Sequence, residues 1–146
     1  ILFVLARGDI VYQEALTDRD ASGIESTCRL RRVLFRGTWT QWEYVNPPMQ
    51  IGVEYRTTER WNGKPVYVRY VNFGSAPNAT TKSVSHGIEN FNQCAGWTGI
   101  LGGANLQGHS GITAVDINAT RIAITTGKDL SASAVYVAVK YTKSTD

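Results

Sequence analysis

The sequence predicts an all-β protein, on the basis of three observations. Apolar side chains recur at every second position, so that Val135, Val137 and Val139 share one face of an expected strand. Turn-forming pairs such as Asn62-Gly63 separate these alternating runs. No window keeps an apolar face at helical spacing over three turns. A chain of 146 residues with 42% hydrophobic residues suits one domain or two very small ones.

The first part of the chain predicts a small knob-like β unit. Its clearest strands are Cys28–Phe35 and Trp39–Val45, and Gly37 between them favours a hairpin turn. Trp39 and Trp42 are three positions apart, so we expect them on opposite faces of the second strand. A unit of few short strands cannot easily cover both faces of its own sheet, which favours self-association.

Two consecutive prolines, Pro47 and Pro48, mark an expected boundary. Each proline removes a donor from any strand ladder and restricts the preceding residue to extended conformations. We therefore place the knob-like unit at residues 1–48 and a distal β domain at residues 49–146.

The distal domain is expected to be an antiparallel, β-sandwich-like unit. The runs Val53–Arg60 and Pro65–Phe73 flank Asn62-Gly63. This pair favours a type I′ hairpin turn, in which both central residues have positive φ. Further alternating segments are Ile112–Ile117, Arg121–Thr125 and Ala134–Thr142.

The segment Asn90–Gly111 differs in composition from the rest of the distal domain, because it is rich in Gly, Asn and Gln. We expect a loop-rich excursion, a type of segment that often carries binding function. An indole beside amide groups suits neutral sugars, which offer apolar ring faces and hydroxyl edges. The alternative is that Trp97 belongs to the core beneath the loop. The candidate binding residues are Trp97, Asn105, Gln107, His109, Asn92 and Gln93.

The sequence contains no catalytic or metal-binding motif, and we expect no enzyme activity, no metal and no cofactor. The two histidines, His86 and His109, lack the spacing of metal ligands. We expect His86 to be a structural hydrogen-bonding residue. The carboxylates of Glu89, Asp116 and Asp129 are scattered along the chain, so they do not identify an acid–base pair.

Charge and hydropathy argue against nucleic-acid and membrane partners. The net charge is only +3, and the basic cluster within residues 29–36 fits a solvated strand better than a phosphate site. No apolar run approaches the ~18 residues of a membrane-spanning helix. Cys28 and Cys94 are the only cysteines. We expect free thiols in a protein assembled in a reducing cytoplasm, although a single disulfide stays an alternative.

Several segments together resemble the C-terminal region of phage and prophage tail fibres. The stretch Gly37-Thr-Trp-Thr-Gln-Trp-Glu-Tyr-Val-Asn-Pro-Pro-Met49 resembles the closing segment of the knob-type domain of phage and pyocin tail fibres. Residues 1–27 resemble the earlier strands of that knob more loosely. Segments that resemble the distal module of such fibres are Gly52–Arg60, Gly63–Tyr67, Val71–Gly74, Lys82–Ile88, Ile122–Gly127 and Val135–Lys143.

The resemblance implies an intertwined homotrimer at the distal tip of a virion tail fibre, assembled in the bacterial cytoplasm. It implies binding of a host receptor without catalysis, the receptor being a bacterial surface glycan or an outer-surface protein. One alternative is a structural knob or connector without receptor contact. Another is a fragment of a polysaccharide-degrading tailspike, in which Glu89, Asp116 or Asp129 would be catalytic.

Overall fold

The computed structural model describes residues 1–19 and 25–146, and their regular secondary structure is entirely β, which confirms the predicted fold class. In the described part of the chain, no helix has the length and hydropathy needed to cross a bilayer. The strands are β1 (Leu2–Arg7), β2 (Ile10–Arg19), β3 (Glu25–Phe35), β4 (Thr38–Trp39), β5 (Glu43–Tyr44), β6 (Glu54–Trp61), β7 (Lys64–Ser75), β8 (Thr81–Ser85), β9 (Phe91–Leu101), β10 (Ala104–Asn105), β11 (Ile112–Ile117), β12 (Arg121–Thr126) and β13 (Ala134–Lys143).

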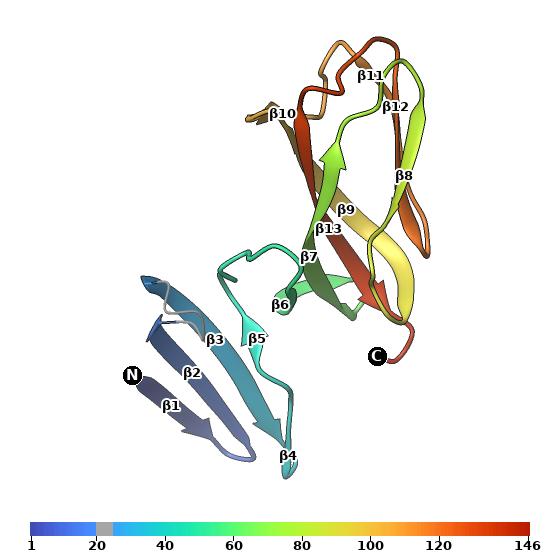
Figure 1. Ribbon diagram of the computed structural model, residues 1–146. Coiled ribbons are helices and arrows are strands. Elements are labelled where there is room, and N and C mark those ends of the chain that lie inside the picture. The colour runs from blue at the N-terminus through green and yellow to red at the C-terminus, as the bar shows by residue number, and fades with distance from the viewer. Residues whose placement is uncertain (20–24) are drawn as a thin grey trace.

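The strands form one long sheet and one short sheet. The long sheet has the order β1-β2-β3-β5-β6-β7-β13-β9-β10, with β4 also paired to β3, and the short sheet has the order β11-β12-β8. Figure 1 shows β1, β2 and β3 as an open layer at one end of the molecule. At the other end, β7, β13 and β9 face β8, β11 and β12 as a sandwich.

The core lies between the two layers of the sandwich. Alternate residues of β13, namely Val135, Val137 and Val139, are fully buried and face the same way, as their period-two spacing predicts. Ile122 and Ile124 of β12 are equally buried and belong to the same core. Burial of such side chains drives the two sheets together.

The turn between β6 and β7 follows the sequence prediction. Asn62 and Gly63 have φ values of 47° and 78°, which are the two positive angles that a type I′ turn requires. Trp61 and Lys64 pair directly on either side of the turn. Pro65 sits opposite Arg60 in the next pair.

Among its described residues, the N-terminal sheet has no comparable core. The consecutive residues Leu2, Phe3, Val4 and Leu5 alternate between the two faces of β1, and each is at least 55% exposed. Both faces of this strand are therefore apolar and open to solvent. A hollow of about 320 Å³ lies on this sheet between β1, β2 and β3.

The two parts of the chain meet where β5 runs parallel to β6 through the single pair Tyr44 and Thr57. The connecting segment, residues 45–53, then passes along β7, where Ile51 bridges Tyr70. Pro47 and Pro48 lie within this segment. The division of the chain at residue 48 stays a prediction.

The second predicted strand of the knob-like unit is interrupted, and this changes the positions of its tryptophans. β4 ends at Trp39 and β5 begins only at Glu43, so strand alternation does not extend to Trp42. Both indoles instead contact the guanidinium of Arg32, with its central carbon 4.3 and 4.5 Å from the two ring centroids. The expectation that they lie on opposite faces is therefore wrong, because the cation holds both rings.

Candidate functional site

The segment predicted as a loop-rich excursion is half strand. β9 occupies eleven residues of it and pairs with β13 along its length, because β13 would otherwise leave one row of backbone groups unpaired. The chain then turns at Gly102 and Gly103 and returns along β9 as β10. Only the part that follows Leu101 is loop-rich.

The returning segment is fixed to β9 by two consecutive residues. Leu106 is fully buried against Gly99, where a Cβ atom would lie only 2.7 Å from the leucine side chain. The Gln107 side chain donates to the carbonyl oxygen of Trp97 at 2.9 Å and accepts from the Gly99 N–H at 3.3 Å. The amide of Gln107 therefore holds the loop in place, which is a structural task.

Asn105 and His109 lie on either side of this anchor, and each has a polar side-chain group that makes no hydrogen bond within the described residues. Asn105 Oδ1 accepts the N–H of Gln107 at 3.0 Å, while its side-chain amide donates no bond within the described residues. His109 Nδ1 accepts the N–H of Gly111 at 3.2 Å, and its Nε2 makes no hydrogen bond within the described residues. Both residues can hydrogen-bond an incoming hydroxyl group.

Trp97 has a more structural position than a binding indole. It lies opposite Val139 in the ladder and packs, half-buried, against the sandwich core. Trp97 also borders a hollow of about 320 Å³, which Val68 and Lys140 line as well. Lys140 is engaged there by both carboxylate oxygens of Glu59, at 2.7 and 2.8 Å.

Asn92 and Gln93 lie at the opposite end of β9 from Asn105. Gln93 pairs with Thr142 near the end of β13, and Asn92 donates to the Thr142 hydroxyl at 3.1 Å. Ile100, which pairs with Asn105, instead lies opposite Tyr136 near the start of β13. The six predicted residues therefore form two separate groups.

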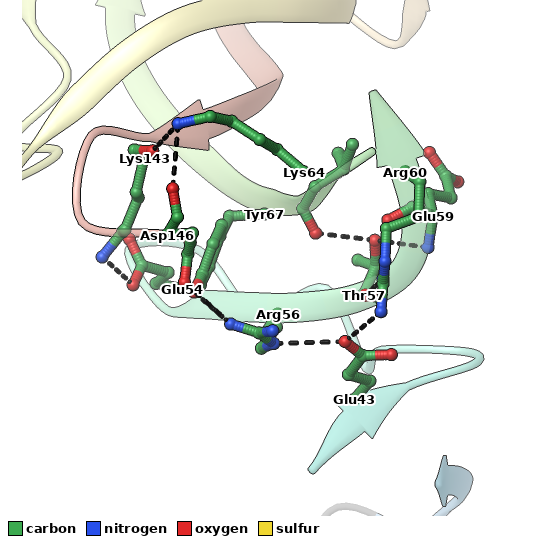
Figure 2. Close-up of polar contacts among 11 residues, drawn as sticks. Glu43, Glu54, Arg56, Thr57, Glu59, Arg60, Lys64, Tyr67, Lys143 and Asp146 are labelled. Atoms are coloured by element: carbon green, nitrogen blue, oxygen red, sulfur yellow. Dashed lines mark hydrogen bonds and ion pairs between the residues drawn. The ribbon is translucent and has the colours of Figure 1, made fainter. Parts of the chain in front are cut away.

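A polar network that sequence reasoning missed joins the two parts of the chain (Figure 2). Glu43 of β5 is buried and accepts from Arg56 Nε at 3.2 Å and from Arg60 Nη2 at 2.6 Å, both on β6. Arg56 also donates to the Tyr67 hydroxyl at 2.8 Å and to the Asp146 carboxylate at 3.1 Å. No local signal predicts this network, because its hydrogen-bonded partners are 11 to 90 residues apart in sequence.

Four rings stack at the same end of the sandwich. Tyr67, Tyr141, Phe91 and His86 follow one another with centroid separations of 5.9, 5.8 and 5.2 Å. Burial raises the pKa of the Tyr67 hydroxyl, with a further contribution from Asp146. Burial raises the pKa of the Tyr141 hydroxyl more strongly, and its hydrogen bond to Glu54 adds to the effect.

The buried His86 has the structural role expected of it. Its Nδ1 accepts the N–H of Ile88 at 3.1 Å, so Nε2 donates to the carbonyl oxygen of Asn118 at 3.0 Å. Both ring nitrogens are thus engaged in holding the turn after β8.

Of the three carboxylates weighed for hydrolysis, Asp116 of β11 lies opposite Ala123 of β12, while Glu89 and Asp129 lie beyond opposite ends of β12. Glu89 follows the β8 end that pairs with Arg121, whereas Asp129 follows the other end of β12. Asp129 accepts from the Ser131 hydroxyl and N–H, and these bonds lower its pKa. Among the described residues, no group of three His, Cys, Asp or Glu could hold a metal ion. Cys28 and Cys94 lie in β3 and β9, and no disulfide appears in the described part of the chain.

The chain matches no protein-family model and no curated protein. The solved structures with similarity to it include tail fibres of pyocins. One is an N-truncated R2-type pyocin tail fibre, with 12% identity and a TM-score of 0.40 over 97% of this chain and 81% of that one. Another is the C-terminal part of the R1 pyocin fibre of P. aeruginosa, with 12% identity and a TM-score of 0.31. That alignment covers 96% of this chain and 56% of the fibre chain.

Proposed function

We propose that this chain is the distal, receptor-binding part of a phage or prophage tail fibre. It forms a homotrimer in the virion after assembly in the bacterial cytoplasm. It attaches the particle to its host by binding a bacterial surface glycan, without cleaving it. Three copies raise a weak single-site affinity through avidity.

The observation that carries this proposal is the exposed apolar N-terminal sheet. Leu5 is 68% exposed and Val4 57% exposed, on opposite faces of the same strand. Monomeric proteins rarely expose contiguous apolar surface of this kind. One neighbour covers one face only, so a closed assembly of several copies is the simplest way to cover both. The resemblance of residues 37–49 to the tail-fibre knob supports three copies.

The loop after β9 is the part of the sandwich best suited to contact a receptor. Leu106 and Gln107 hold it rigidly, which reduces the entropy lost on binding. Asn105 and His109 flank this anchor, and the Asn105 amide and His109 Nε2 make no hydrogen bond within the part of the chain that the structure describes. Sugars offer matching hydroxyl groups.

The assembly is tested by light scattering during gel filtration over a dilution series. We expect a stable species of three times the 16.1 kDa chain mass. A clean monomer at all concentrations would contradict the proposed assembly and with it the fibre-tip function.

Receptor binding is tested by the adsorption of fluorescently labelled protein to a panel of bacterial strains. Asn105→Asp keeps the oxygen that accepts from Gln107 but replaces the amide donor with a negative charge. We expect it to reduce adsorption about tenfold relative to the wild type. Gln41→Glu makes the same change of charge at an exposed position of the N-terminal unit and should leave adsorption unchanged.

Two outcomes distinguish the alternatives. A stable trimer that adsorbs to none of the strains favours a structural connector. Release of reducing sugar from purified envelope polysaccharide favours a tailspike fragment instead.

A further inference from the structure

A hollow of about 260 Å³ opens at the edge of the sandwich where β6 stops pairing with β7. The ladder between those strands ends at Glu54 and Arg69. On the same edge of β7, the next residue is Tyr70, which forms a β-bridge with Ile51 of the connecting segment. Ser85 at the end of β8 and the two residues that follow it also line the hollow. Its lining includes Ile51, Arg69, Tyr70, Asn72, Ser85 and Gly87.

Arg69 brings to this hollow a positive charge that has no ion-pair partner among the described residues. Its Nη1 donates to the carbonyl oxygen of Gly87 at 2.9 Å, which uses one of the five N–H donors of a guanidinium. No carboxylate among the described residues lies within ion-pair distance of it. Its ladder partner Glu54 is held by Lys143 at 2.6 Å and by the Tyr141 hydroxyl.

Some cations of the sandwich have an ion-pair partner, whereas Arg69, like Lys82 and Lys128, has none among the described residues. Arg56, Lys140 and Lys143 each contact a carboxylate at 3.1 Å or less. The Arg69 guanidinium has no such partner in the described part of the chain, and its hydrogen bond to Gly87 lies at the surface, so its other N–H donors are accessible to solvent. Arg69 is therefore placed to gain from an anion that arrives from solution.

The backbone next to Arg69 leaves the guanidinium open. Gly87 has a φ of +62°, a conformation that side chains other than glycine rarely adopt. A Cβ atom at this position would lie 3.7 Å from Nη2 of Arg69. The glycine thus gives the turn its shape and keeps a side chain away from the cation.

The other polar groups around the hollow also have donors to offer. Ser85 Oγ accepts the N–H of Gly87 at 3.3 Å, so its hydroxyl hydrogen is available. Asn72 Oδ1 accepts the N–H of Gly74 at 2.9 Å, so its side-chain amide is available as well. Ile51 and Tyr70 add apolar surface, which suits the C–H face of a sugar ring.

We propose that this hollow binds one acidic sugar residue of the surface glycan, with its carboxylate or phosphate on the planar fork of Arg69. The planar guanidinium matches either anion by two parallel hydrogen bonds. The proposal rests on the proposed function, because it names the class of saccharide that the fibre tip recognises. It adds a subsite separate from the loop that carries Asn105.

The test is a titration of the ¹⁵N-labelled protein with three probes, followed by NMR. Methyl β-D-glucuronide carries a carboxylate, glucose 1-phosphate carries a phosphate, and methyl β-D-glucoside carries neither. We expect saturable shifts of the Gly87 amide and the Arg69 Nε–H with one or both acidic probes, and none with the glucoside. Equal shifts with the glucoside, or no saturable shift with either acidic probe, would overturn the proposal.

Matched variants assign the effect to the guanidinium. Arg69→Gln should weaken binding of the acidic probe roughly tenfold or more, and Arg69→Lys should weaken it less because it keeps the charge and loses the fork. Lys128→Gln removes the same charge at an exposed site beyond the far end of β12 and should change nothing. Thermal unfolding verifies that each variant is folded. Wild-type affinity in Arg69→Gln would contradict the proposed subsite.

Failure of this subsite and failure of the fibre-tip function give different results. If labelled protein adsorbs to bacteria and Arg69→Gln adsorbs equally well, the subsite is wrong and the fibre-tip function stands. If the acidic probe binds at Arg69 but no strain captures the protein, the subsite stands as a site for an acidic saccharide and the fibre-tip function is wrong.

Discussion

The two ends of this chain differ in how the faces of their β-sheets are covered. In the sandwich, β13 buries alternate residues completely against β12 of the facing sheet. In the N-terminal layer, β1 leaves its apolar residues exposed on both faces. The sandwich therefore carries its own core, whereas the N-terminal sheet depends on surfaces from outside the chain.

This difference has a thermodynamic consequence. Burial of apolar area within the chain stabilises the sandwich at any protein concentration. Stability that comes from neighbouring copies depends on concentration by mass action. The two ends of the molecule should therefore unfold differently on dilution.

The largest expected effect comes from replacing a buried leucine of the sandwich with alanine. The same replacement at an exposed leucine of the N-terminal sheet is the comparison. Leu106→Ala removes a fully buried side chain from the sandwich and should lower the free energy of unfolding by about 2–5 kcal/mol. Leu5→Ala, at a side chain that is 68% exposed in the single chain, should change sandwich unfolding by about 0.5 kcal/mol or less. Urea denaturation monitored by tryptophan fluorescence measures both.

Leu5→Ala should instead weaken self-association, which a dilution series in light scattering detects. If it lowered sandwich stability as much as Leu106→Ala and left association unchanged, the contrast between the two ends would be lost.

A smaller effect is expected at the contact between the ends. Glu43→Gln removes the carboxylate shared by Arg56 and Arg60 and should cost about 2 kcal/mol, because Glu43 and Arg56 are mostly buried. Hydrogen exchange should increase at β5 and hardly change in β13. Glu59→Gln breaks a half-exposed pair with Lys140 and should cost at most about 1 kcal/mol. Equal exchange rates at β5 in both variants would show that Glu43 does not hold the ends together.

The smallest expected effect is confined to alkaline pH. The pKa values of Tyr67 and Tyr141 are raised in the folded chain, mainly by burial. The unfolded chain loses these protons near pH 10, so above that pH the folded chain holds more protons and the free energy of unfolding falls. Below pH 10 this contribution is fully present. Tyr141→Phe should make the decline shallower in urea titrations between pH 8 and 11. Tyr12→Phe, at an exposed ring, is the control and should leave the slope as it is.

Local patterns predict the parts of this molecule that depend on neighbouring residues in sequence. The buried face of Val135, Val137 and Val139 follows from the alternation of apolar residues. The turn at Asn62-Gly63 follows from the tolerance of Asn and Gly for the positive φ angles observed there. β9 was missed because its Gly, Asn and Gln content disfavours a strand, while its pairing with β13 supplies the missing stabilisation.

The candidate site was only partly accessible from sequence, for a related reason. Composition marked the segment that contains Asn105 and His109, but it could not show that Gln107 is used internally or that Asn92 lies at the other end of β9. No sequence pattern marked Arg69 as a candidate binding residue. Its contact with Gly87 depends on how the sheet that contains β7 packs against the sheet that contains β8.

The anchoring of the returning segment bears on how this surface can change over generations. Leu106 and Gln107 hold the loop from within, while residues 102–105, 108 and 110 around them are exposed. Substitutions at the exposed positions other than glycine should change the chemistry of this surface with little effect on the free energy of unfolding. Under the proposed function, a lineage can therefore change the receptor that this loop contacts step by step on an unchanged scaffold, as long as these two residues stay.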